Sequence, residues 1–399
     1  MKKVYICSNE NKLYIGKWTS KIGNVVFDYV NTIAIVSSCR TGSVFLAIYQ
    51  ASEVLISIIF NLIGGVIADG SNKKRLLIYT DIFSGIVSLI LSFFVESSYI
   101  VVLIIIANII LAIISAYNSP IYRSIIREMV YKEKIGKYNA ISNAGYQIAA
   151  VISPLLALYF VNRFNSRVAL IFNACTFFVS AMMEIMLKPI NSNPEKIMEK
   201  KFIQNLFNGI KYLVSQKNIF LLIVFASIIN FFLAGYNLGV PNTSIFLGDI
   251  SRYIYTYILI VEAIGGILGS YLSVKLKNKQ STHSILVLVG LSLCLIPKFS
   301  QFNSIFICLV PFFIATSAMS IFNVNFMTAI QTQISQEYLG RVFGIIFASS
   351  AILMPIGSFL FTYIINRYEI FEFLFVGVGV LLVNALFYII ERISCKKND

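Results

Sequence analysis

About twelve apolar runs in this chain are long enough to cross a lipid bilayer, and this pattern leaves few folds open. A helix rises about 1.5 Å per residue, so a hydrocarbon core of about 30 Å needs roughly 20 apolar residues. The runs form two sets of six with a polar stretch between them: 17–38, 44–68, 76–95, 99–118, 137–161 and 168–187, then 218–240, 253–274, 284–297, 303–327, 342–365 and 370–390. The pattern predicts an all-α polytopic membrane protein built from two six-helix bundles.

The composition excludes an ordinary soluble domain. The 399 residues are 58% hydrophobic and 13% charged, whereas soluble domains are about half apolar and about a quarter charged. A net charge of +14 would suggest a nucleic-acid partner in a soluble protein. Here the loops between the apolar runs account for the charge, so we expect no nucleic-acid partner.

The placement of the cations predicts the topology. With the N-terminus in the cytosol, 26 of the 32 Lys and Arg residues lie in cytosolic segments and 6 lie outside. This asymmetry follows the positive-inside rule and requires an even number of spans. We therefore expect a multi-pass protein of the bacterial inner membrane with both termini in the cytosol, and no Lys or Arg within the spans.

The same pattern divides the chain into three segments. Residues 1–187 and 218–399 are the two six-helix bundles, and 188–217 is a cytosolic linker. Pro189 and Pro194 interrupt helix formation at the start of the linker. Apolar residues then recur at helical spacing: Ile203, Leu206, Ile210, Leu213 and Val214. This spacing predicts an amphipathic helix on the inner leaflet.

The loop after the second span has the most informative local sequence. Gly65 precedes Asp69 by four residues, and Lys73, Lys74 and Arg75 follow a short turn. A glycine at this position lets a neighbouring helix approach closely. The Asp69 carboxylate is suited to cap the positive N-terminus of another helix. The three cations are expected to hold the turn on the cytosolic side.

Two pieces of the first half recur about 204 residues later. Gly65 and Asp69 correspond to Gly269 and Ser273, and the run 135–137 corresponds to 339–341, which contains Gly340 and Arg341. A further pair of prolines, expected at helix bends, matches at an offset of 201: Pro154 and Pro355. The halves are therefore interpreted as parallel six-span repeats.

These motifs resemble the major facilitator superfamily. The run Gly65–Arg75 is similar to its cytoplasmic signature loop, although Gly70 and Asn72 depart from the usual pattern, and the run 330–344 is similar to a loop of the macrolide-efflux-like and multidrug exporters. The resemblance implies alternating access around a midplane site, and a gating contact from Asp69 to Gly340 and Arg341. The surroundings of Pro154 partly resemble the antiporter signature of that family.

Acidic residues inside the spans are the candidates for coupling and substrate recognition, because an intramembrane charge is costly. Asp28 and Glu53 are each near the middle of a span. Each shares a helical face with polar residues: Asn24 and Asn31 with Asp28, and Gln50 with Glu53. We expect these acids to bind a proton and to recognise a cation.

Three other acids are expected to lie in helix contacts or near loop cations. Glu262 shares a helical face with Gly265, Gly266 and Gly269. This face is typical of a close helix contact, and Glu262 is kept as a further coupling candidate. Two acids near cytosolic helix ends are expected to pair with loop cations such as Lys74 or Lys188: Asp81 and Glu184.

The sequence predicts a secondary transporter rather than an enzyme. It contains no G-x-x-x-x-G-K-[ST] loop for ATP, so we expect a proton gradient as the energy source, with no cofactor and no metal. The favoured function is proton-coupled export of amphipathic or cationic small molecules by a monomer. The alternatives are export of a specific metabolite, siderophore or peptide, uptake or lipid flipping, and a sensor that does not transport.

Overall fold

A computed structural model describes residues 8–38, 42–70, 72–163, 166–190, 202–247, 254–275, 282–302 and 304–396. Within these ranges the chain forms thirteen α-helices and two short 3-10 helices. The first six helices are α1 (Asn9–Ser38), α2 (Gly42–Gly70), α3 (Lys73–Phe93), α4 (Ile100–Met129), α5 (Ile135–Arg163) and α6 (Ser166–Ile185). The others are α7 (Phe202–Ser215), α8 (Lys217–Phe246), α9 (Ile254–Lys275), α10 (Thr282–Phe299), α11 (Ile305–Gln333), α12 (Leu339–Tyr368) and α13 (Glu372–Lys396). The prediction of an all-α fold is confirmed for the residues that the structure describes.

Most of these helices have the length and hydropathy of membrane spans. In the described part of the chain, nine helices are long and apolar enough to cross a bilayer, and the stretch Ile56–Asp69 of α2 is a shorter apolar helix. The helix α1 is not among the nine, and it carries Lys12, Lys17, Lys21 and Asp28 along its length. The apolar runs of the sequence therefore form helices, and some of these helices extend beyond the runs.

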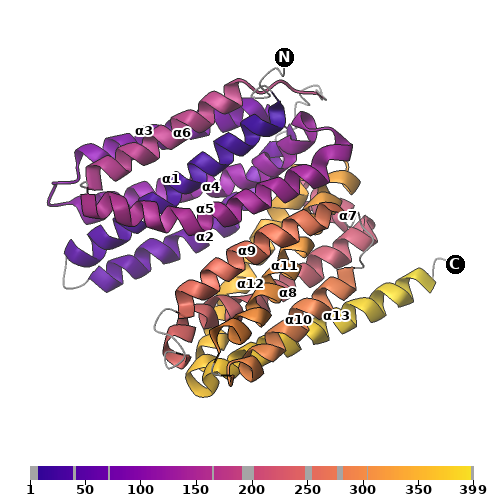
Figure 1. Cartoon of the computed structure of the whole chain (residues 1–399). Coiled ribbons are helices and arrows are strands. Elements are labelled where there is room, and N and C mark those ends of the chain that lie inside the picture. Colours follow the sequence, from indigo (N-terminus) through magenta and orange to yellow (C-terminus); the bar gives the residue numbers. More distant parts are fainter. Residues whose placement is uncertain are drawn as a thin grey trace, which may run out of the picture. The chain divides into compact units, whose positions relative to one another are not determined.

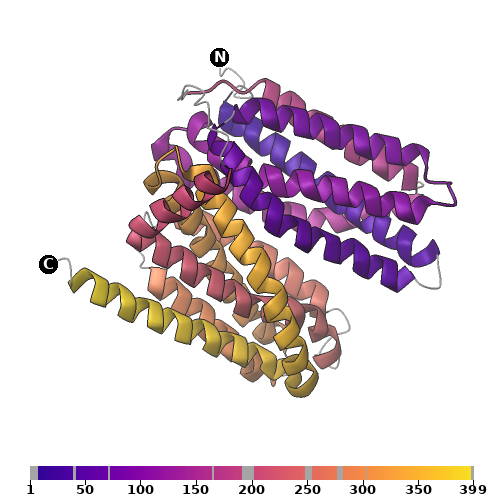
Figure 2. The ribbon, with the colours of Figure 1, turned by 180° about the vertical axis from the view of Figure 1, so that it is seen from behind.

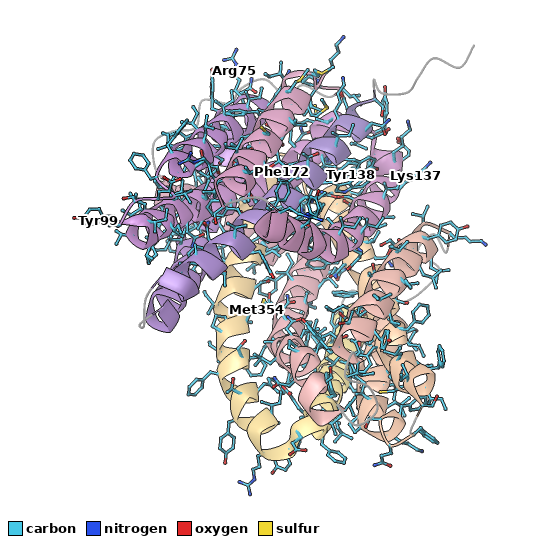
Figure 3. The ribbon with its side chains drawn as sticks, turned by 60° about the vertical axis from the view of Figure 1, so that its left-hand side comes forward. Arg75, Tyr99, Lys137, Tyr138, Phe172 and Met354 are labelled. Carbon is cyan, nitrogen blue, oxygen red and sulfur yellow. The ribbon has the colours of Figure 1, made fainter. Side chains whose placement is uncertain are left out.

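Large apolar side chains on the outer helix faces are exposed rather than buried. Phe306 and Phe359 are 85% and 86% exposed. Figure 3 shows the side chain of Tyr99, in the turn between α3 and α4, pointing away from the helices. Soluble proteins keep such apolar surfaces small, whereas lipid tails cover them without cost. The chain is a multi-pass membrane protein.

The contacts divide the chain into two compact units. The first unit comprises Met1–Tyr138, Ile148–Ile210 and Gln331–Ala348, and the second comprises Asn139–Gln147, Lys211–Ile330 and Ser349–Asp399. The start of α12 therefore packs with helices of the first half of the sequence. The helix α7 lies within the predicted linker 188–217, and the domain boundaries themselves stay a prediction.

Each unit has its own arrangement of packed helices. In the first unit, α6 packs against both α1 and α3, and α2 packs against α4, as Figure 1 shows. In the second unit, α13 packs against α10 and α8, which is clear from the opposite side in Figure 2. The first unit positions the candidate site, because α1, α3, α4 and α6 surround a common cavity.

Candidate functional site

Three glycines let α2 and the start of α12 approach within backbone contact in the first unit. A Cβ atom added at Gly65 would lie 2.7 Å from the carbonyl oxygen of Gly340 and 2.9 Å from the Cα of Gly344. A Cβ atom added at Gly344 would lie 2.6 Å from the carbonyl oxygen of Asn61. Larger side chains do not fit here, so these positions require glycine for close packing.

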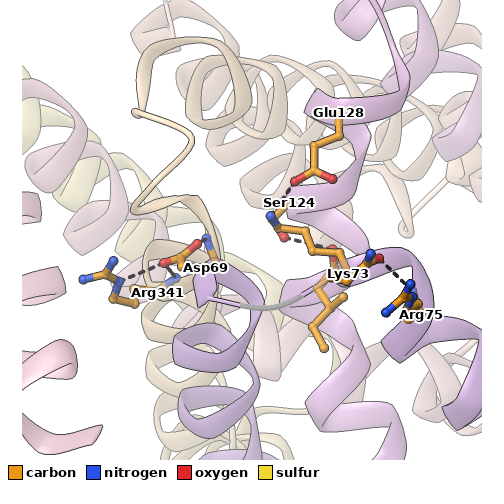
Figure 4. Close-up of polar contacts among 9 residues, drawn as sticks. Asp69, Lys73, Arg75, Ser124, Glu128 and Arg341 are labelled. Atoms are coloured by element: carbon orange, nitrogen blue, oxygen red, sulfur yellow. Dashed lines mark hydrogen bonds and ion pairs between the residues drawn. The ribbon is translucent and has the colours of Figure 1, made fainter. Parts of the chain in front are cut away.

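The close approach of α2 and α12 places Asp69 directly at the N-terminus of α12 (Figure 4). Its carboxylate accepts hydrogen bonds from the backbone N–H groups of Gly340 (2.6 Å) and Arg341 (3.0 Å). It also accepts one from the Nε of Arg341, at 2.8 Å. The Asp69 side chain is fully buried and that of Arg341 is 7% exposed. Asp69 thus caps the helix and neutralises a buried guanidinium.

The other donors of Arg341 are also bonded, and one of them reaches α7. Its Nη2 donates to the carbonyl of Glu337 at 2.9 Å, and its Nη1 donates to the carbonyl of Asn205 at 3.4 Å. Its guanidinium stacks 4.4 Å from the ring centre of Tyr338. The linker helix therefore contacts the same arginine as the signature loop, a contact that sequence reasoning did not predict.

The three cations after Asp69 have separate roles in the structure. Lys73 is buried and forms a 2.5 Å ion pair with Glu128 of α4. Lys74 donates to two backbone carbonyls at the end of α6, those of Ile185 (2.7 Å) and Leu187 (2.8 Å). Arg75 is exposed, and its backbone N–H bonds to the capping side chain of Asn72. Of these three cations only Arg75 has an exposed side chain.

A cavity of about 700 Å³ lies in the first unit and is lined by residues of α1, α2, α3, α4 and α6 and by Phe347 of α12. Asn24 and Asp28 line it as expected, and Asp28 is exposed to it. The hydroxyl of Tyr49 donates to Asp28 at 3.0 Å. Asn31 is 1% exposed and is not among the lining residues. Asp28 therefore faces the cavity while Asn31 is packed inside the helix bundle.

The side chains of Gln50, Glu53 and Pro154 are outside the described residues. Pro355 lies inside α12 and its side chain is exposed. The pairing expected between Asp28 and Glu53 stays a prediction.

The cavity also contains basic residues that the sequence analysis assigned to cytosolic segments, and the absence of Lys and Arg from the hydrocarbon stays a prediction. Lys17, Lys21 and Arg123 line the same cavity as Asp28. The Lys17 ammonium lies 4.8 Å from the ring centre of Tyr122, and Lys21 is close enough to Asp28 to interact electrostatically. Because α1 begins at Asn9, both lysines lie within the helix and share the face of Asp28.

Asp81 and Glu184 are not the partners of Lys74 that we expected. They are 8% and 5% exposed and both line the cavity. Lys74 bonds instead to the carbonyls at the end of α6, where the helix dipole places negative potential. The sequence signal was the helical register: Asp81 and Glu184 fall on the buried faces of α3 and α6.

Glu262 lies in the second unit, and it accepts a hydrogen bond from the hydroxyl of Tyr236. The glycine face next to it packs closely on α11. A Cβ atom added at Gly269 would meet the carbonyl of Ser317, and one added at Gly265 would meet the hydroxyl of Thr316. The structure places this face in a tight helix contact, with Glu262 near its edge.

Known proteins resemble this chain over most of its length. Residues 41–358 match the family described as Major Facilitator Superfamily. Macrolide efflux protein A of Enterococcus faecalis is 26% identical over 314 residues, covering 73% of this chain and 92% of that protein. A Bacillus subtilis protein named as a bacilysin exporter, BacE, is 25% identical over 346 residues, covering 83% and 82%.

A crystal structure of a bacterial homologue of the iron transporter ferroportin in its outward-facing state has the same fold. Its TM-score is 0.75 at 13% identity, and the match covers 95% of this chain and 98% of that one. This likeness confirms the predicted fold class. The family match covers well over half of the sequence, and its members are transporters rather than enzymes. This chain belongs to the Major Facilitator Superfamily.

Proposed function

We propose that this transporter exports amphipathic or cationic small molecules by alternating access, driven by a proton gradient. The observation that carries the proposal is the cavity of the first unit, which presents the exposed carboxylate of Asp28 among amide and hydroxyl groups. Its volume of about 700 Å³ suits a drug-sized molecule. The similarity to efflux proteins at about 26% identity supports the outward direction, and hence antiport with protons.

In this proposal Asp28 recognises the cationic group of the substrate. The Tyr49 hydroxyl and the amide of Asn108, which donates to the Tyr49 carbonyl at 3.1 Å, hold this region in place. Glu53 and Gln50 on α2 and Glu262 on α9 are kept as further coupling or binding candidates. We place the protein in the bacterial cell membrane as a monomer with cytosolic termini, without a cofactor.

The contact between Asp69 and the start of α12 is proposed to lock one state of the transport cycle. It joins the end of α2 to Gly340 and Arg341 through a carboxylate that is fully buried. Moving α12 away from α2 breaks all of these bonds at once, because they share one acceptor. Such a contact favours two discrete arrangements over a continuum.

A second candidate function is export of a specific zwitterionic metabolite, such as a peptide. The observation that favours it is the presence of Lys17, Lys21 and Arg123 in the cavity, since these cations repel a purely cationic substrate. The similarity to a protein named as a bacilysin exporter supports the same alternative.

The test is accumulation of ethidium and of erythromycin in cells that express the protein, with and without a proton uncoupler. Expression of the wild type should lower accumulation, and the uncoupler should abolish this effect. Asp28→Asn should lose export of ethidium, while Asp28→Glu, which retains the charge, should keep part of it. Unchanged accumulation of both compounds would favour the zwitterionic alternative. Export by Asp28→Asn at the wild-type rate would remove Asp28 from the site.

A further inference from the structure

Two buried acids meet inside the cavity without an obvious structural purpose. Asp81 of α3 and Glu184 of α6 are 8% and 5% exposed, and both line the cavity. The helices α3 and α6 pack against each other. The two carboxyl groups are close enough to interact electrostatically. They form a pair contributed by two helices.

The pair is only partly satisfied by the residues around it. The Ser180 hydroxyl donates a hydrogen bond to Asp81. The Oε2 atom of Glu184 is buried and has no hydrogen-bond partner in the part of the chain that the structure describes. No ion pair among the described residues includes either acid. A buried carboxylate oxygen without a partner, on a residue that lines a cavity, requires an explanation such as a bound proton or ligand.

Two cations that contact the end of α6 in the structure bond to backbone carbonyls rather than to these acids. Lys12 donates to the carbonyl of Met186 at 2.7 Å, and Lys74 donates to the carbonyls of Ile185 and Leu187.

The other titratable groups that face the cavity come from α1 and α4. They are Lys17, Lys21, Asp28, Tyr122 and Arg123. Among them Tyr122 is close enough to Glu184 to interact with it.

Two carboxylates side by side in a buried site repel each other, so one proton between them is the stable arrangement. Such a proton belongs to the pair rather than to either residue. We propose that Asp81 and Glu184 together form the proton-binding site of this transporter, separate from Asp28, which faces the substrate. The cavity gives the pair access to water.

In this step the pair carries one proton from water on the outer side to water in the cytosol. One proton from water on the outer side binds a carboxylate oxygen of the pair and forms an O–H bond. That O–H bond breaks when the pair faces the cytosol, and the proton passes to water there. The role of the pair in coupling rests on the proposed proton-driven export. The presence of one shared proton on the pair does not depend on that proposal.

The shared proton is tested on the purified full-length protein by infrared spectroscopy. A protonated carboxyl group has a C=O stretching band that disappears as the pH is raised through its titration. Glu184→Gln and Asp81→Asn should each remove the band or move its titration midpoint by about one pH unit or more, because coupled acids titrate together. Asp28→Asn is the matched control and should leave this band unchanged. A wild-type titration retained in both variants would overturn the proposal.

Coupling is tested separately in proteoliposomes with ethidium as the probe. Glu184→Gln should lose accumulation driven by a pH gradient and retain exchange of labelled for unlabelled ethidium. Gradient-driven accumulation by Glu184→Gln at the wild-type level would overturn the role in coupling, with proton-driven transport still intact. If the pH gradient drives no ethidium accumulation by the wild-type protein, the proposed function itself would be overturned. Ser180→Ala is the alternative variant if Glu184→Gln does not fold, because it removes only the hydroxyl that bonds to Asp81. It should shift the midpoint of the infrared titration. An unchanged midpoint would count against the proposal.

Discussion

Replacing Asp69 with asparagine tests whether the contact between α2 and α12 is held by charge. The carboxylate accepts three hydrogen bonds, from the backbone N–H groups of Gly340 and Arg341 and from the Arg341 side chain. Asparagine has a single acceptor oxygen and presents an amide NH₂ to the remaining donors. The variant therefore keeps at most part of this cap and leaves the buried guanidinium without its counter-ion.

The expected effect is a large shift toward the state in which the start of α12 is separated from the end of α2. Removing one partner of a buried ion pair costs about 3–5 kcal/mol. Arg341 retains its bonds to the carbonyls of Glu337 and Asn205, so we expect the lower end, about 3 kcal/mol. At about 1.4 kcal/mol for each factor of ten, the contact should open roughly 100-fold more often.

Hydrogen exchange measured by mass spectrometry reports this opening directly. Exchange in the peptide that contains Gly340 and Arg341 should accelerate by about 100-fold in Asp69→Asn, since amide exchange follows local opening. Glu128→Gln is the matched control, because it breaks the buried pair with Lys73 in the same unit without touching α12. It should leave this peptide unchanged. Equal exchange in Asp69→Asn and wild type would refute the reasoning.

Two further substitutions test the packing and the ion pair around this contact. Gly65→Ala should strongly reduce export although the protein is present at its normal level. The added Cβ lies 2.7 Å and 2.9 Å from backbone atoms of Gly340 and Gly344, and such overpacking costs about 1–3 kcal/mol. Export at the wild-type rate would contradict this expectation. Glu128→Gln should lower the free energy of unfolding by about 3 kcal/mol, since it leaves Lys73 buried and unpaired. A thermal melt in detergent measures the loss, which Glu128→Leu combined with Lys73→Met should largely reverse.

The features that were predictable from the sequence depend on local composition and on spacing. Long apolar runs indicate membrane helices wherever they fall, and the structure forms helices over them. The resemblance of Gly65–Arg75 to a signature loop led to the expected partners of Asp69, and the structure brings Asp69 together with Gly340 and Arg341. The gating role of that contact is a proposal.

The charged lining of the cavity was not predictable by the same reasoning. Hydropathy placed Lys17 and Lys21 at the edge of a span, whereas α1 begins at Asn9 and carries both inward along the face of Asp28. Asp81 and Glu184 were assigned to loop cations for the same reason. Hydropathy averages over all faces of a helix, and therefore does not distinguish a charge that faces solvent from one that faces a cavity.

By itself the sequence determined the class of this protein and the approximate positions of its helices, because the bilayer selects for length and apolar composition in each segment independently. Only the tertiary structure decided which charges are paired and which acids share a cavity. Asp69 and Arg341 are 272 residues apart in the chain, and Asp81 meets Glu184 only because α3 packs on α6. Burial and electrostatic interaction depend on these distant neighbours, so the chemistry of the site comes from the packing of the helices.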